Sequence, residues 1–476
     1  LIIGGTMLLN SPRVQQRVSV VLATELENHI GTRVSLGGVK WLFPTDIVID
    51  SLTIDDQEGE HLLTADRLAT KVEWIPLILK RQLSIRNIRL FNPNIHIYKS
   101  DASSDYNYQF LIDAFTSKEK KDKEGPSKLS MRINTLLIRH AHICHHNKSH
   151  CQSGKLQLDN LSIDDLSAQL SLKTLSADSV SLVVRQLGFK EHSGLCIDNL
   201  YLHLVANRHG ATLANFQLDM PHSSLQMDTI WLSYKLDEKS LTGSNTTEST
   251  RVSKNHPQIY LKGKVKPSYI TPSDLESILP QTKGITERVN LTAEFMGSPS
   301  RINIKALDIH TEHRDFSLHA NAKLTQSETT RDDISDTQTL QDLLLGTFSA
   351  LDVDLHEITL TEEFWSTLAG QAPDIYKLIP EQFAHLGGIT ITGDLLHDKN
   401  KTSVDLRALT GAGNLNTHIS LHNQEHYTGY IDGTNLNIAQ IIPESPLTKT
   451  NIAVEAQGSI RKESRSFKEF YNSIEG

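Results

Sequence analysis

The chain is poor in core-forming side chains and has no surplus of positive charge. Hydrophobic residues make up 38% of its 476 residues and aromatic residues only 6%. The chain exceeds one typical domain, so we expect it to fold without filling a large core densely. Its net charge is -9, and its Lys and Arg residues are scattered along the sequence. A basic groove is therefore excluded, and we expect no nucleic-acid partner.

The chain also has no apolar run long enough to cross a membrane. Residues 1–9 are mostly apolar, whereas a spanning helix needs roughly 20 such residues. They are followed by Asn10-Ser11-Pro12-Arg13, which is a helix start and not a signal-peptide cleavage site. We interpret residues 1–9 as the end of an N-terminal membrane anchor. A truncated signal sequence and a buried segment are the alternatives.

Enzyme signatures are missing as well. The sequence has no phosphate loop, nucleophile elbow, metalloprotease helix motif or dinucleotide fingerprint. Two Asp pairs, Asp55-Asp56 and Asp164-Asp165, lie beside predicted strand ends, where turn formation is the commoner role. We predict no catalytic residue and no cofactor.

An eight-residue pattern recurs along the chain: two apolar-polar-apolar triplets separated by two polar or small residues. The three-residue step between the triplets would place them on opposite faces of a regular strand. A bulge or corner at the polar pair restores a single apolar face. The copies span residues 47–54, 83–90, 131–138, 156–163, 195–202, 302–309 and 353–360.

The repetition predicts a mainly β fold, an elongated curved sheet that forms an apolar-lined trough. An ordinary β-sandwich, whose strands alternate for core packing, is the alternative. In the trough interpretation, the apolar residues of four copies line one face and contact lipid. These lining residues are Ile47, Ile49, Leu52, Ile54, Leu83, Ile85, Ile88, Leu90, Leu156, Leu158, Leu161, Ile163, Ile302, Ile304, Leu307 and Ile309.

Helix signals are few. Residues 11–30 are predicted to form an amphipathic helix, with Ser11 as cap, Pro12 at the first position and Gly31 as the stop. We expect its apolar stripe to pack on the adjacent strands, since Glu25 and Glu27 dilute any basic membrane-binding face. The stripe consists of Val14, Val18, Val21, Leu22, Leu26 and Ile30. Short helices are predicted after Thr271 and after Thr361, the second of them before residues 373–386.

Polar and charged tracts divide the strands into four predicted β modules. The modules span 32–116, 129–236, 258–324 and 341–476, the last with short helices and cut short. The loops between them span 117–128, 237–257 and 325–340. The anchor (1–9) and the helical segment (10–31) precede the first module.

The densest local chemistry is a histidine and cysteine cluster. Alternation would place His140, His142 and Cys144 on one strand face, within reach of His150 or Cys151. The spacing matches no established closed metal site, so we favour polar residues on an outer face and predict no metal. A Cys144–Cys151 disulfide across the intervening turn stays open, and Cys196 would then have no cysteine partner.

Several strings carry a family resemblance through their order along the chain. They are Trp41-Leu42-Phe43-Pro44, residues 47–56, 59–68, 85–98 and 108–115, and later residues 378–388 and 410–413. Together with the anchor and its helix, they resemble the AsmA-like superfamily and, within it, the TamB branch of translocation and assembly modules of the Bacteroidota type. Between these stretches only the strand rhythm agrees. The C-terminal portion that such proteins use at the outer membrane is missing.

The resemblance implies a periplasmic protein anchored in the inner membrane by a single N-terminal pass. It implies an apolar trough that carries phospholipid between the inner and outer membranes, with acyl chains as partners. It also implies a role in outer-membrane protein assembly, through a barrel protein bound by the missing C-terminal region. A structural or adhesive β-repeat protein of the cell surface, without a ligand inside, is the alternative.

Overall fold

The computed structural model describes most of the chain and shows a mainly β protein. Its 24 strands belong to one long, curved, mixed sheet with few short helices, as the sequence predicted. The described residues are 11–42, 46–72, 83–99, 105–116, 129–147, 160–175, 179–235, 258–298, 300–326, 348–377, 379, 381–423, 425–442 and 444–459.

The chain divides into two compact units, and the boundary lies between Pro221 and His222. The described part of the first unit includes helices α2 (Pro12–Ile30) and α4 (Gln109–Thr116). Its strands are β1 (Val34–Leu36), β2 (Val39–Leu42), β3 (Asp46–Asp55), β4 (His61–Val72), β5 (Leu83–Phe91), β6 (Asn94–Lys99), β7 (Leu129–Asn147), β8 (Asn160–Leu175), β9 (Ser179–Glu191), β10 (Cys196–Ile197), β11 (Asn199–Asn207) and β12 (Gly210–Asp219).

The first unit is antiparallel except at one junction. Strands β5 and β6 both pair in parallel with β7, so the chain must cross over between β6 and β7, and α4 lies in this connection. At the N-terminal edge, β1 and β2 pair with successive parts of β3.

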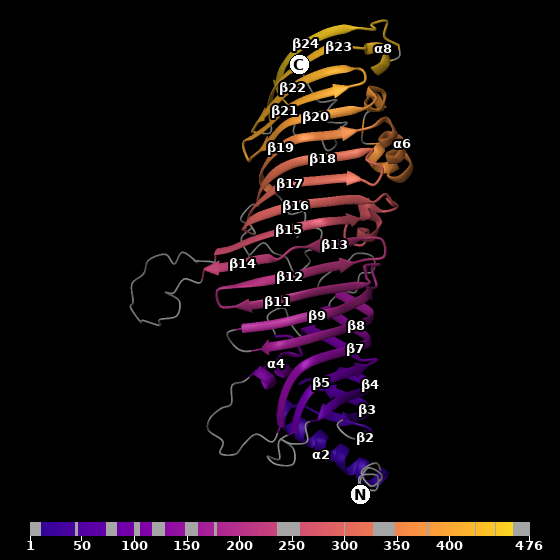
Figure 1. Cartoon of the computed structure of the whole chain (residues 1–476), viewed down its shortest axis with the longest axis vertical. Coiled ribbons are helices and arrows are strands. Elements are labelled where there is room, and N and C mark those ends of the chain that lie inside the picture. The colour runs from indigo at the N-terminus through magenta and orange to yellow at the C-terminus, as the bar shows by residue number, and fades with distance from the viewer. Residues whose placement is uncertain are drawn as a thin grey trace, which may run out of the picture. The chain divides into compact units, whose positions relative to one another are not determined.

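The second unit is antiparallel at every pairing described here. Its strands are β13 (Ser224–Met227), β14 (Ile230–Lys235), β15 (Gln258–Ile270), β16 (Val289–Ser298), β17 (Arg301–Thr311), β18 (Phe316–Gln326), β19 (Phe348–Leu360), β20 (Ile389–His397), β21 (Lys401–Thr410), β22 (Gly413–His422), β23 (His426–Leu436) and β24 (Thr450–Ser459). From β15 to β24, each strand pairs with the next in chain order (Figure 1).

Short helices connect some of these strands. They are η2 (Pro272–Leu275), η3 (Pro280–Thr282), α6 (Glu362–Gln371), α7 (Pro373–Tyr376), η5 (Glu381–Leu386) and α8 (Ile438–Ile441). Figure 1 shows α6 and α8 at the same end of the strands. The short helices predicted after Thr271 and after Thr361 are confirmed, and α4, η3, α7, η5 and α8 were not predicted.

Helix α2 follows its local signals, with two corrections. Pro12 is its first residue, and Gly31 ends it in the left-handed region at φ 82, where its N–H donates to the Glu27 carbonyl. Ser11 is the N-cap by position, but its side chain makes no capping hydrogen bond. Val21 is 66% exposed, so it does not share the packed stripe predicted for it.

The predicted bulge is present at the polar pair of two copies, residues 302–309 and 353–360. In β17, Ile304 and Leu307 pair with residues that are two positions apart on β18, so β17 contains one extra residue at this point. Ala306 takes up the bend at φ 49. Likewise, Leu355 and Ile358 of β19 pair with residues that are two positions apart on β20, so β19 also contains one extra residue. In these two copies both triplets therefore lie on one face, as expected from the sequence.

The structure divides into two compact units, and the finer division into four β modules stays a prediction. The predicted loops 117–128 and 237–257 lie outside the described residues, as does most of 325–340. Thr325 and Gln326, assigned to that last loop, belong to β18. The predicted anchor, residues 1–9, also lies outside the described residues.

Candidate functional site

Apolar side chains of neighbouring strands lie directly opposite one another in the second unit. Ile304 of β17 pairs with Phe295 of β16 and Ala322 of β18, and Val353 of β19 pairs with Leu395 of β20. Directly paired residues lie on the same face of a sheet. The complete row, from β16 to β22, is Phe295, Ile304, Ala322, Val353, Leu395, Val404 and Ile419.

Three more rows run beside this one. They pass through Ile302, Leu307 and Ile309, each of which pairs with apolar residues of β18. The partners in β18 and β19 are Leu324 and Leu351 in the first row, Ala320 and Leu355 in the second, and Leu318 and Ile358 in the third. We call the surface formed by these four rows the apolar face.

The opposite surface, which we call the polar face, carries the intervening side chains. The Lys264 ammonium lies 2.8 Å from Glu294, and the Lys323 ammonium lies 2.7 Å from Asp352. The hydrogen bond and charge of Asp352 raise the pKa of Lys323, so this lysine remains a cation. His418 pairs with Asp405 on the same surface. Exposed pairs of this kind stabilise the fold little, but they distinguish this surface from the apolar face.

The apolar face is only partly covered by the described chain. Ile304, Val353 and Val404 are half-buried, and Ile419 and Val454 are exposed by 39% and 44%. At the end of the strands where α6 and η5 lie, Trp365, Leu386, Ile389 and Ala412 form a buried cluster. The described helices therefore close one margin of this face and leave its middle partly exposed.

In the first unit, helices α2 and α4 cover the apolar side of the first strands. Leu26 and Ile30 of α2 pack with Leu52 of β3, and Phe110 and Leu111 of α4 pack against the same cluster. Packing of α2 on the first strands, which the sequence predicted, is confirmed. Here an acyl chain would have to displace a helix.

The predicted lining residues therefore fall into three groups. Ile47, Ile49, Leu52 and Leu90 are buried in the first unit, and Ile54 and Ile88 pack partly buried against the same core. Leu161, Ile163, Ile302, Ile304, Leu307 and Ile309 are half-buried, and Ile163 packs on a small core around Ala141. Leu156 and Leu158 lie outside the described residues, as do the side chains of Leu83 and Ile85.

The histidine cluster forms ion pairs with the second Asp pair. His140 Nδ1 lies 2.5 Å from Asp165, and His142 Nδ1 lies 2.5 Å from Asp164. His140 and Asp165 are bulge residues of adjacent strands, with φ 52 each. Within the described residues, no three His, Cys, Asp or Glu side chains are placed to hold a metal. Cys151 lies outside this part of the chain, so the Cys144–Cys151 disulfide stays a prediction.

The first Asp pair forms a turn, as predicted. Asp56 accepts hydrogen bonds of 2.9 Å from the N–H groups of Glu58 and Glu60, which closes the loop between β3 and β4. The Tyr98 hydroxyl donates to the second Asp56 oxygen at 2.6 Å. Burial acts to raise the pKa of Asp56, but the hydrogen bonds from Tyr98 and the Glu60 N–H outweigh it and lower the pKa below its ordinary value.

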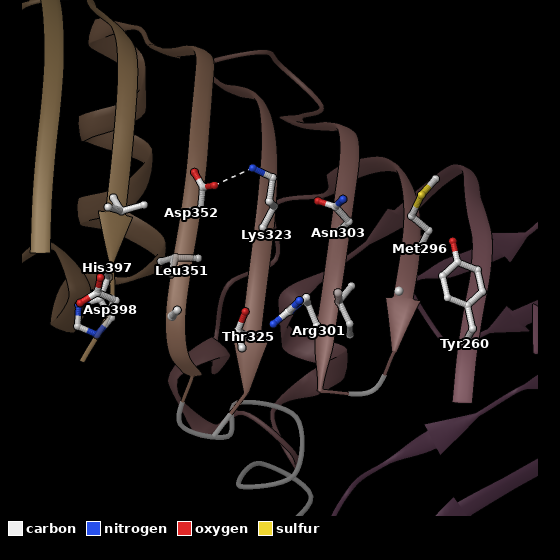
Figure 2. Close-up of a pocket in the computed structure, with 14 residues that line it drawn as sticks. Tyr260, Met296, Arg301, Asn303, Lys323, Thr325, Leu351, Asp352, His397 and Asp398 are labelled. Atoms are coloured by element: carbon white, nitrogen blue, oxygen red, sulfur yellow. Dashed lines mark hydrogen bonds and ion pairs between the residues drawn. The ribbon is translucent and has the colours of Figure 1, made fainter. Parts of the chain in front are cut away.

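The sequence did not predict a cavity of about 540 Å³ on β15 to β20. Figure 2 shows Tyr260, Arg301, Asn303, Lys323 and Asp352 around it, and most of the lining belongs to the polar face. The alternation of these polar residues with apolar residues along each strand was visible in the sequence. What brings them together is the pairing register of six successive strands, β15 to β20, and no local signal encodes that register.

Among the described helices, none is both long enough and apolar enough to cross a membrane. No protein-family model matches this chain, and a search of curated proteins finds no match either.

Proposed function

We propose that this protein belongs to the TamB branch of the AsmA-like superfamily and carries phospholipid between the inner and outer membranes. In this proposal, residues 1–9 end an inner-membrane anchor, and the bulk of the chain lies in the periplasm. The protein acts without catalysis or a cofactor. It also assists outer-membrane protein assembly, through a barrel partner bound by a C-terminal region beyond this sequence.

One observation carries the lipid-binding part of the proposal: four apolar rows run across a sheet whose other face is charged. Contact between water and such a face is unfavourable, so an apolar molecule or segment that covered the face would lower the free energy. An acyl chain would suit it, since each methylene buried contributes about 0.8 kcal/mol. Adjacent strands are about 4.8 Å apart, so a chain moving along a row meets a similar surface at every step.

The protein cover over the first strands favours a second candidate, a structural or adhesive β-repeat protein. There, α2 and α4 fill the apolar side with their own side chains. If residues outside the described part fill the second unit in the same way, no ligand is needed.

Native mass spectrometry of the chain, purified in mild detergent, separates the two candidates. Lipid carriage predicts co-purifying phospholipid, which should decrease in Ile304→Asp because the carboxylate interrupts the central row. Asn303→Asp places a carboxylate on the polar face and should retain the lipid. Wild-type protein that carries no phospholipid would favour the filled core.

A further inference from the structure

The cavity on the polar face has the size and composition of a small-molecule site. Its volume of about 540 Å³ lies within the usual range for ligand pockets. The Tyr260 side chain, 49% exposed, and Leu396, 41% exposed, give it apolar wall surface, and Met296 contributes more. Figure 2 shows Tyr260 and Met296 on different strands among the side chains that line the cavity.

The carboxylates in the lining are already occupied by the chain's own groups. Asp352 accepts from the Lys323 ammonium at 2.7 Å. Asp398 accepts from the backbone N–H groups of Asn400 and Lys401, at 2.8 and 2.7 Å. These contacts satisfy the negative charges of the cavity locally.

The hydrogen-bonding groups without a partner in the cavity are mostly donors. Across the described chain, the Arg301 guanidinium, the Asn303 amide and the Tyr260 and Thr325 hydroxyls make no hydrogen bond or ion pair. Arg301 pairs in register with Thr325 of the next strand, so their side chains lie next to one another (Figure 2). Lys323, which has three N–H donors, uses one of them on Asp352.

We propose that this cavity binds a small organic anion through Arg301, with a phosphate ester as the preferred chemistry. A guanidinium binds phosphate or carboxylate through two parallel hydrogen bonds, and phosphate accepts further bonds from Thr325, Asn303 and Lys323. The apolar body of the ligand would lie against Tyr260 and Met296. The phosphate can belong to a soluble ester or to a lipid headgroup.

Titration calorimetry of the full chain with phenyl phosphate tests the site, with phenol as the uncharged control ligand. Arg301→Gln should weaken phenyl phosphate binding by roughly tenfold or more, because it removes the charge-assisted pair. Lys305→Gln, an exposed cation on the same strand and face but outside the lining, should change the affinity by less than about twofold. Tyr260→Ala supplies an independent variant from another strand and should also weaken binding.

The proposal is overturned if phenyl phosphate gives no binding heat at millimolar concentration, if phenol binds equally well, or if Arg301→Gln and Lys305→Gln behave alike. Competition by phosphatidylglycerol vesicles that Arg301→Gln abolishes would assign the site to a lipid headgroup. Retained phenyl phosphate binding without such competition would assign it to a soluble ester. Ile304→Asp lies on the opposite face and should leave phenyl phosphate binding unchanged, so this test is independent of the lipid path.

Discussion

At the scale of single residues, equivalent positions of the repeated pattern have different surroundings. Leu52 is 4% exposed beneath α2, whereas Ile304 is half-buried on a face that the described chain covers only partly. The sequence predicts that both residues face the apolar side. It does not predict what covers them, because the cover comes from elements distant along the chain.

This difference predicts unequal effects of the same substitution. Leu52→Asp buries an unpaired carboxylate and should lower the free energy of unfolding of its unit by several kcal/mol, about 3 or more. Ile304→Asp keeps access to water or lipid and should cost about 1 kcal/mol or less. Urea unfolding of both variants checks this. Equal large losses would indicate that the apolar face of the second unit is closed.

A second prediction at this scale concerns the pKa of Asp56, which is lowered in the folded chain. A lowered pKa stabilises the fold at pH values above the unfolded pKa of about 4, and this contribution is lost as pH falls through the folded pKa. Tyr98→Phe removes one hydrogen bond to the carboxylate, so it should cost about 1–3 kcal/mol at neutral pH and less in acid. Unfolding of both proteins at about pH 7 and pH 3 measures the difference. An equal cost at both pH values would contradict this role of Tyr98.

At the scale of elements, the bulges explain how the pattern becomes a one-sided sheet. Ala306 lies at φ 49, a region that is unfavourable for residues with a Cβ atom. The polar pair could be predicted as a bulge from its spacing alone, because any other geometry would place half of each pattern on the charged face. Helix α2 was equally predictable from Pro12 and Gly31. Its exposed Val21 was not, because tertiary packing selects which part of an apolar stripe is used.

Two substitutions of the bulge residue Ala306 should change the stability of the second unit in opposite directions. Ala306→Gly should raise the stability of the second unit by about 0.5–1 kcal/mol, since glycine adopts this conformation without a Cβ penalty. Ala306→Val should lower stability by about 1 kcal/mol or more, because a β-branched side chain is strained there. Thermal unfolding of the two variants reports the shifts. Shifts of the same sign in both would contradict the bulge geometry.

At the scale of the whole molecule, sequence reasoning anticipated the fold class and the sidedness of the strands. The row through Ile304 runs from β16 to β22, and the rows through Ile302, Leu307 and Ile309 reach β19, as the pattern predicted. The cover of α2 and α4 over the first strands and the polar-face cavity could not be predicted from the sequence. Both depend on which strands and helices become neighbours, and no local periodicity specifies that.

The central claim is that acyl chains lie on the apolar face of the second unit and not on the polar face. The most direct test is photocrosslinking in intact cells, from a photoreactive residue placed at Val353 or at the adjacent Asp354. These positions alternate on β19, and their partners on β20 are Leu395 and Asp394. The account predicts phospholipid adducts from position 353 and none from position 354. Adducts from both positions, or from neither, would contradict it.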